Sequence, residues 1–266
     1  MKRLFAGLLA LMAVFALAGC GPVMTEEPDP TARPKTTPTP SQQDIIAQAA
    51  EVLAQSVEKE LDMGLGYLVF NWSVRNTAVD NAQPYNSATI TVGQAAGKYC
   101  IIDHTEKTDG YTSFVYYESF RYIDTGTTCK RYHTSQASAQ EIHLARLPFL
   151  PNLPTWPEHI QEATITKSGR TKTYELLLSR QGNQALRELT WFDSFLSTYA
   201  PDIEVRIRVT VNPSDGLAQA IDVVVIGQAT SNGAFMEYTV SIDYTHLQDP
   251  PELTLPDLST YTPATT

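Results

Sequence analysis

The chain has 266 residues, and its 19 Lys and Arg residues against 29 Asp and Glu residues give a formal charge of −10. Such a surface repels the phosphate backbone of nucleic acids, and no lysine- or arginine-rich segment offsets it, so we expect no nucleic-acid partner. Aromatic and β-branched residues become frequent after residue 41. About 220 residues remain there, enough for one sizeable domain or two small ones.

The N-terminal segment has the pattern of an export signal. Lys2 and Arg3 form a basic start, and the apolar stretch from Leu4 to Leu17 is too short to span a membrane comfortably. The sequence that ends it, Leu17-Ala18-Gly19-Cys20, resembles the bacterial lipobox. This resemblance implies cleavage before Cys20 and attachment of lipid to its sulfur, so residues 1–19 are predicted to be a signal peptide. An ordinary secretory signal with an accidental cysteine is the alternative.

The mature chain would then begin at Cys20, outside the cytoplasm, and be anchored to the bacterial cell membrane. Two or more acyl chains hold a protein firmly, whereas one chain binds only marginally. Cleavage removes Lys2 and Arg3 and no acidic residue, which leaves 17 basic and 29 acidic residues and a formal charge of −12. Residues 20–41 are rich in Pro and Thr, so we predict a semi-extended tether without a core.

The first predicted element of the domain is a helix over residues 42–62, with Ser41 as its N-cap. Its apolar stripe consists of Ile46, Ala49, Ala50, Leu53, Val57 and Leu61. Strands with a two-residue alternation follow. The stretch 112–123 predicts one shared face for Phe114, Tyr116, Phe120 and Tyr122. Residues 124–128 then predict a hairpin turn into a further strand.

A proline-rich segment separates the two halves of the sequence, with prolines at positions 148, 151, 154 and 157. Three interpretations stay open: a rigid loop that covers an apolar opening, a plain linker, and a polyproline II ligand. The covering residues would be Leu147, Phe149, Leu150, Leu153 and Trp156. After this segment come a predicted hairpin turning at Ser168 and Gly169, an amphipathic helix over 183–200 and three strands. In these three strands apolar and polar residues alternate regularly, which indicates an antiparallel sheet.

The order of these elements resembles that of the LolA/LppX-type lipoproteins. The similarity covers residues 42–258 and is strongest in the closing stretches VTVNPSDGLAQAIDVVVIG and YTVSIDYTHLQDPPELTLPD. It implies an α+β fold in which a strongly curved antiparallel sheet, a half-barrel, carries helices on its concave face. Residues 259–266 would form a C-terminal tail. Two tandem cystatin-like helix-plus-sheet units, divided near residues 150–160, are the alternative fold.

The one-sided apolar pattern and the family resemblance predict a non-enzymatic protein that binds or carries an apolar, lipid-like ligand. The candidate lining residues are Phe70, Trp72, Phe114, Tyr116, Phe120 and Tyr238. Apolar sheet faces usually fill a solid core instead. The alternative function is therefore a protein–protein interaction module of the cell envelope that has a solid core and no ligand.

The sequence predicts no catalytic residue, no cofactor and no metal. Ser56 and Lys59 match the SxxK pattern of penicillin-interacting enzymes, but the companion motifs of those enzymes are missing. The five histidines have no recognised spacing for metal ligands. Cys100 and Cys129 are the thiols that remain after lipidation. Export allows a disulfide between them, and two separate buried thiols are the alternative.

Overall fold

A computed structural model describes residues 40–62, 68–77, 84, 86–134, 150–189, 192, 195–247, 249 and 251–264. The chain divides into two units, residues 1–39 and 40–266, and every described residue belongs to the second unit. The predicted signal peptide, the lipidation site Cys20 and nearly all of the predicted tether lie outside the described residues.

The described elements follow the order that the sequence predicts: a leading helix, a run of strands, a second helix and a final group of strands. The helices are α1 (Gln42–Asp62) and α3 (Arg180–Glu188), with short 3-10 helices at Leu150–Asn152, Pro157–His159 and Leu258–Thr260. The strands are β1 (Leu68–Asn76), β2 (Asn86–Ala95), β3 (Lys98–Lys107), β4 (Gly110–Tyr117), β5 (Phe120–Asp124), β6 (Cys129–His133), β7 (Ile160–Ser168), β8 (Thr171–Leu178), β9 (Glu204–Val211), β10 (Ala218–Gln228), β11 (Phe235–His246) and β12 (Thr262–Pro263).

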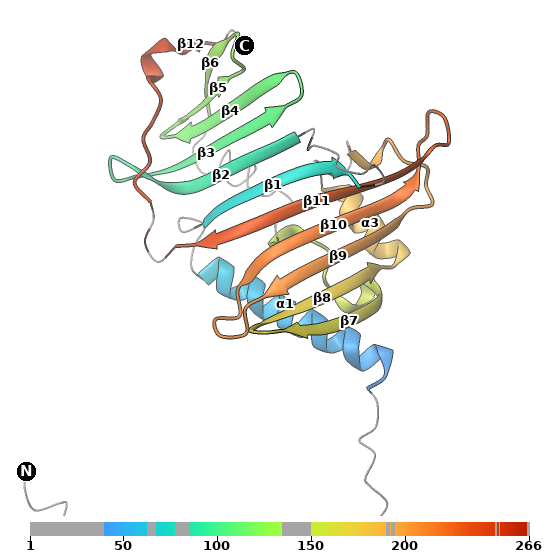
Figure 1. Ribbon diagram of the computed structural model, residues 1–266. Coiled ribbons are helices and arrows are strands. Elements are labelled where there is room, and N and C mark those ends of the chain that lie inside the picture. Colours follow the sequence, from blue (N-terminus) through green and yellow to red (C-terminus); the bar gives the residue numbers. More distant parts are fainter. Residues whose placement is uncertain are drawn as a thin grey trace, which may run out of the picture. The chain divides into compact units, whose positions relative to one another are not determined.

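The twelve described strands form one sheet in the order β12-β6-β5-β4-β3-β2-β1-β11-β10-β9-β8-β7 (Figure 1). Every neighbouring pair is antiparallel except β12 and β6. The sheet is strongly curved, and the helices lie on its concave face (Figure 1). The predicted α+β half-barrel is confirmed. Because β1 pairs with β11, both halves of the chain share one sheet, and the alternative of two cystatin-like units is wrong.

Helix α1 has the predicted bounds because a capping box fixes its start. The Asp44 amide donates to Ser41 Oγ over 3.2 Å, and the Ser41 amide donates to the Asp44 carboxylate over 3.0 Å. The predicted apolar stripe holds for Ala49, Ala50 and Leu53, which are buried. It is wrong at the end of the helix, where Leu61 is 54% exposed and the polar residues Ser56 and Glu60 are buried instead.

The core lies between the helices and the side of the sheet that faces them, which we call the inner face. On β9, Val205, Ile207, Val209 and Val211 are buried while Arg206 and Arg208 are exposed, as the alternation predicts. The helical region supplies the buried residues Leu53, Leu186, Phe192 and Leu196. Helix α3 starts before the predicted residue 183, because Ser179 accepts a hydrogen bond from the Gly182 amide and caps it at Arg180. It ends at Glu188, and Phe192, Phe195 and Leu196 of the predicted span are again helical.

The hairpin between β4 and β5 reverses one predicted face. Tyr117 pairs directly with Phe120, which leaves a loop of two residues, and Glu118 adopts a φ of 53° there. Directly paired residues lie on the same face of a sheet, so even-numbered residues of β4 share a face with odd-numbered residues of β5. The prediction that Phe120 and Tyr122 lie on the same face as Phe114 and Tyr116 is therefore wrong.

The C-terminal segment covers the opposite, outer face of β3 to β5. Tyr261 is 6% exposed and packs in a cluster with Cys100, Val115 and Tyr122, against which Leu253, Leu255 and Leu258 also pack. Strand β12 then pairs in parallel with β6 (Figure 1). The ordered fold continues to residue 264, and the predicted tail over 259–266 is corrected accordingly.

At Gly93 the C-terminal segment passes very close to the sheet. A Cβ atom at Gly93 would lie 2.4 Å from the Pro251 carbonyl oxygen, which accepts a hydrogen bond from the Gln94 amide. We expect Gly93→Ala to lower the free energy of unfolding by about 1–3 kcal/mol, because the overpacked backbone must move. Urea denaturation measures the change. Ser87→Ala, at the other end of β2, is the control, and equal losses in both variants would contradict this account.

Candidate functional site

The structure places the predicted ligand-lining residues at separate sites. Tyr116 is buried and Phe114 half-buried on the inner face of β4. Tyr238 is half-buried on the inner face of β11. Strands β4 and β11 are four strand spacings apart, about 19 Å across the sheet. Phe120 lies in the outer cluster under the C-terminal segment. These residues therefore do not line one compact pocket.

Phe70 and Trp72 lie on β1, between these two sites. Their backbones pair with Tyr244 and Ile242 of β11, and their side chains lie outside the described residues. Tyr238, near the start of β11, contacts two aromatic rings from the segment after α3. The ring centres of Phe195 and Tyr199 lie 5.6 Å and 6.1 Å from that of Tyr238, both edge-on. The sequence predicts that Tyr238 lies on the apolar face of its strand, but it does not predict the contacts with Phe195 and Tyr199.

A polar cluster is buried where the last turns of α1 meet the sheet. Ser56 is fully buried and Glu60 is 5% exposed, and their spacing of four residues places them on one face of the helix. Neither the Ser56 hydroxyl nor either Glu60 carboxyl oxygen has a hydrogen-bond partner. Burial raises the pKa of Glu60 to about 8. The Ala218 backbone N–H opposes part of that rise, although it does not reach either carboxyl oxygen with the geometry of an ordinary hydrogen bond.

The sheet contributes further polar groups to this cluster. The Leu150 amide donates to the Tyr244 hydroxyl over 2.9 Å. Burial raises the pKa of Tyr244 well above its ordinary value, and the charge of Glu60 adds to the rise. The His246 ring stacks on Tyr244 at 5.8 Å, and its Nε2 lies 2.7 Å from the Ala218 carbonyl oxygen. Four segments therefore meet here: α1, β10, β11 and the proline-rich segment.

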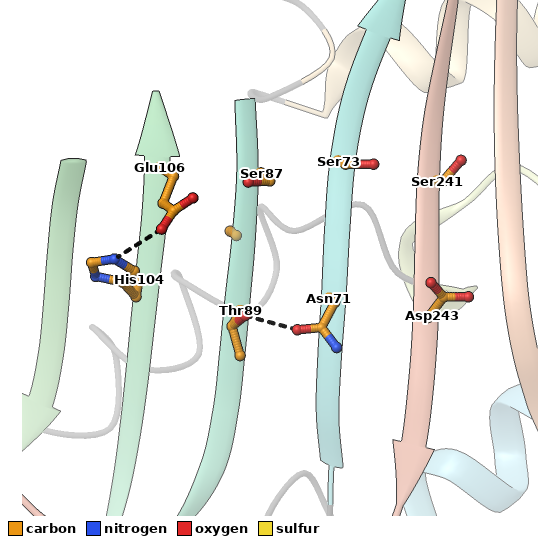
Figure 2. Close-up of a pocket in the computed structure, with 9 residues that line it drawn as sticks. Asn71, Ser73, Ser87, Thr89, His104, Glu106, Ser241 and Asp243 are labelled. Atoms are coloured by element: carbon orange, nitrogen blue, oxygen red, sulfur yellow. Dashed lines mark hydrogen bonds and ion pairs between the residues drawn. The ribbon is translucent and has the colours of Figure 1, made fainter. Parts of the chain in front are cut away.

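The outer face carries a shallow polar groove of 260 Å³ (Figure 2). Its lining residues are Asn71, Ser73, Ser87, Ala88, Thr89, His104, Glu106, Ser241 and Asp243. Thr89 Oγ1 donates to Asn71 Oδ1 over 2.8 Å, and His104 Nε2 lies 4.0 Å from Glu106 Oε1 (Figure 2). Hydroxyl, amide and carboxylate groups form hydrogen bonds but give no apolar wall, so this groove does not suit an acyl chain.

The two cysteines of the domain are free thiols in the structure. Cys100 lies on β3 and Cys129 on β6, so three strand spacings, about 14 Å, separate their strands. A disulfide requires Cα atoms within about 7 Å. The disulfide that the sequence allows is therefore not formed, and burial raises the pKa of the Cys100 thiol to about 12.

A metal site is one chemical possibility for the described part of the chain. Among its residues, no group of three or more His, Cys, Asp and Glu side chains is arranged to hold a metal ion. Lys59 Nζ donates to the Asp215 carbonyl oxygen over 2.7 Å, which ties the helix to the turn between β9 and β10. No described helix is both long enough and apolar enough to cross a membrane.

Comparison with known proteins gives weak similarities. No protein-family model matches the chain, and no curated protein matches it. Among solved structures, it is similar to a LolA superfamily protein from Nitrosomonas europaea, with 11% identity over 80% of this chain and 97% of that one and a TM-score of 0.27. A porin-like protein from Bacteroides uniformis has 12% identity over 66% and 95%, with a TM-score of 0.19. Both TM-scores are below 0.5, so neither similarity supports an argument about function.

The free thiols should differ in reactivity because the thiolate is the reacting form. In the full chain carrying Cys20→Ser, we expect iodoacetamide to label half-buried Cys129 faster than buried Cys100. Unfolding without a reductant should then allow both thiols to be labelled, as measured by intact mass. A chain that takes up no label and is lighter by two hydrogens would contradict the absence of a disulfide.

Glu60 should make stability depend on pH. Its pKa is 4.5 in the unfolded chain and about 8 in the folded one, so the folded chain binds the proton more tightly. This stabilisation is fully present below pH 4.5 and is lost as the pH rises through 8. We expect the free energy of unfolding to fall across this window by a few kcal/mol, at about 1.4 kcal/mol per pKa unit.

The measurement is urea denaturation at a series of pH values. Glu60→Gln should flatten the dependence, because the amide does not ionise. Glu58→Gln, at an exposed position of the same helix, is the matched control and should leave the wild-type slope unchanged. The same slope in wild type and Glu60→Gln would show that Glu60 titrates normally.

Proposed function

We propose that this chain is an extracytoplasmic, non-enzymatic binding protein that holds an apolar acyl ligand against the inner face of its sheet. The observation that carries this proposal is that one face of the curved sheet is apolar from strand to strand. Buried residues on that face run across its strands, including Val74, Ile90, Ile207, Val223 and Ile242. A curved apolar surface under helices is a common form of site for an apolar ligand.

Half-buried aromatic residues at the rim of this surface support the proposal. Tyr238, Phe195 and Phe114 are in contact with the core but are not enclosed by it. Because these rings keep some accessible area, they are able to contact a ligand at the edge of the inner face. A ligand that reaches Phe114 and Tyr238 together must lie across the strands, which suits an elongated acyl chain.

The proline-rich segment supplies a cover for part of the inner face. Leu150 and Leu153 are buried in the core at 0% and 4% exposure, as the covering-loop interpretation predicts. Trp156 is 60% exposed and does not take part. The predicted covering residues Leu147 and Phe149 lie outside the described residues. Moving a short apolar segment away from the sheet costs less free energy than moving a long helix. This segment is therefore a suitable place for the ligand to enter.

The proposed location rests on the N-terminal sequence. Lipid on Cys20 would anchor the mature chain to the outer side of a bacterial cell membrane, and residues 20–41 would act as the tether. This arrangement brings a binding domain close to a source of acyl ligands. The described domain supplies no membrane-spanning helix that would replace the anchor.

A second function, an envelope interaction module with a solid core, is favoured by the packing beneath the helices. Leu186, Phe192 and Leu196 all have 0% exposure. Such dense packing leaves no room for a ligand at these positions. In that case, crosslinking in cells should recover a reproducible protein neighbour, and the purified protein should carry no small molecule.

The two functions are separated by native mass spectrometry of the full exported chain carrying Cys20→Ser, which lacks the acyl anchor. We expect the purified protein to retain acyl lipid, and the delipidated protein to take it up again from detergent. Tyr238→Ala should lower the occupancy several-fold, because it removes a ring at the rim. Tyr132→Ala, on exposed β6, is the control. Failure to detect or load lipid under any condition would contradict the proposal.

A further inference from the structure

Ser56 and Glu60 leave three polar atoms without partners inside the domain: the serine hydroxyl oxygen and both carboxyl oxygens. Both residues are more than nine-tenths buried. Buried polar groups in folded proteins are almost always hydrogen-bonded, and exceptions often mark a place where another molecule binds. Here all three atoms are on one face of α1, within a single turn of helix. Their shared position makes this an organised polar site.

The surroundings of this polar site are apolar. Leu53 lies one turn before Ser56 on α1, and Ile242 and Tyr244 of β11 belong to the same core cluster. Tyr244 also lies close enough to Glu60 for the charge of the carboxylate to raise the pKa of the phenol. The site is therefore a small hydrogen-bonding region in the same apolar interior that the proposed function assigns to an acyl chain.

No described cation neutralises Glu60. Lys59 is the nearest basic residue in sequence, but its Nζ donates to the Asp215 carbonyl oxygen at the turn after β9. The His246 ring is engaged with the Ala218 carbonyl oxygen. Glu58 and Asp62, the other acidic residues at this end of the helix, are exposed. A carboxylate near the C-terminus of a helix is also disfavoured by the helix dipole.

The chemical state of Glu60 decides what it can bind. With a pKa of about 8, the side chain is mainly a neutral carboxylic acid at neutral pH. A neutral acid donates one hydrogen bond and accepts others, and the Ser56 hydroxyl does the same. An anionic group placed here would bring an unpaired charge into an apolar interior, which is costly. A neutral group with both donors and acceptors fits without that cost.

We infer that Ser56 and Glu60 form a polar subsite that holds the neutral, hydroxyl- or ester-bearing head of an acyl ligand. The acyl chain of this ligand lies along the apolar inner face. This inference rests on the proposed function and narrows it to one ligand class, neutral acyl lipids such as monoacylglycerols. Fatty acid anions are excluded from the subsite by their charge, and an alkyl ammonium is disfavoured because pairing with it requires an ionised Glu60 in an apolar interior.

The experiment is a displacement titration on the full chain carrying Cys20→Ser, with N-phenyl-1-naphthylamine as the apolar fluorescent probe. The competitors are 1-lauroylglycerol, dodecane, dodecanoate and dodecylamine. We expect 1-lauroylglycerol to bind about tenfold more tightly than dodecane, the effect of one or two net hydrogen bonds. The two charged competitors should bind more weakly than 1-lauroylglycerol.

Variants assign this preference to the subsite. Glu60→Leu should bring 1-lauroylglycerol and dodecane to similar affinities while dodecane binding is kept, and Ser56→Ala should reduce the preference in part. Glu60→Gln keeps a donor and an acceptor and should retain the preference. Glu58→Leu, at an exposed site of the same helix, is the matched control. Above pH 8 the wild-type preference should fall, whereas that of Glu60→Gln should stay constant.

The outcomes separate this inference from the function on which it rests. If no competitor and no probe binds to folded wild-type protein, the proposed function is contradicted. If all four competitors bind equally, or Glu60→Leu keeps the full preference, ligand binding stands and the subsite is overturned. Tighter binding of dodecylamine than of 1-lauroylglycerol would also overturn it, because Glu60 would then act as an anion.

Discussion

The antiparallel pairing of β1 with β11 is the constraint on which the rest of the structure depends. It runs without interruption from Leu68 opposite His246 to Asn76 opposite Tyr238. Strands β2 to β6 extend from one side of this seam, and β10 to β7 extend from the other. Without the seam, each half of the chain would need its own core. With it, a single apolar inner face crosses the whole sheet.

The two halves of the sheet bury their apolar residues in different ways. Beneath β7 to β11, helices and the proline-rich segment cover the inner face, and the outer face carries exposed charges such as Arg206 and Arg208. At β3 to β5, both faces carry apolar clusters, because the C-terminal segment returns to cover the outer one. The buried acid Glu60 lies where α1 meets β10 and β11. A polar group at such a boundary costs stability, which fits a role in binding rather than in folding.

Much of the fold could be predicted from local pattern. The bounds of α1 follow from its capping box, and the alternation on β9 follows from a sheet with one dry and one wet face. The reversal at Phe120 could not be predicted, because it depends on the length of one hairpin loop, which shifts every later side chain to the other face. The stretch FVYY on β4 does contain a signal, since a continuous apolar run indicates burial on both faces.

The candidate site was less predictable than the fold. Tyr238 follows from alternation, but its contacts with Phe195 and Tyr199 depend on how a distant segment packs. Glu60 is next to Leu61 of the predicted apolar stripe. Glu60 is buried and Leu61 is exposed because of the way the end of α1 packs against β10 and β11, which the sequence alone does not reveal. The separation of Cys100 from Cys129 likewise depends on strand order, which cysteine spacing does not encode.

The most direct test of this account is a disulfide engineered across the seam between β1 and β11. Ser73 and Ser241 are directly paired on the outer face, where paired Cα atoms lie about 4.5–5.5 Å apart, within disulfide range. Intact mass of the exported chain carrying Cys20→Ser, Ser73→Cys and Ser241→Cys measures the outcome. One continuous sheet predicts a bond between the two introduced cysteines, with a loss of two hydrogens and a higher denaturation midpoint. Two introduced thiols that stay reduced in the folded, oxidised protein would contradict the seam and the single inner face.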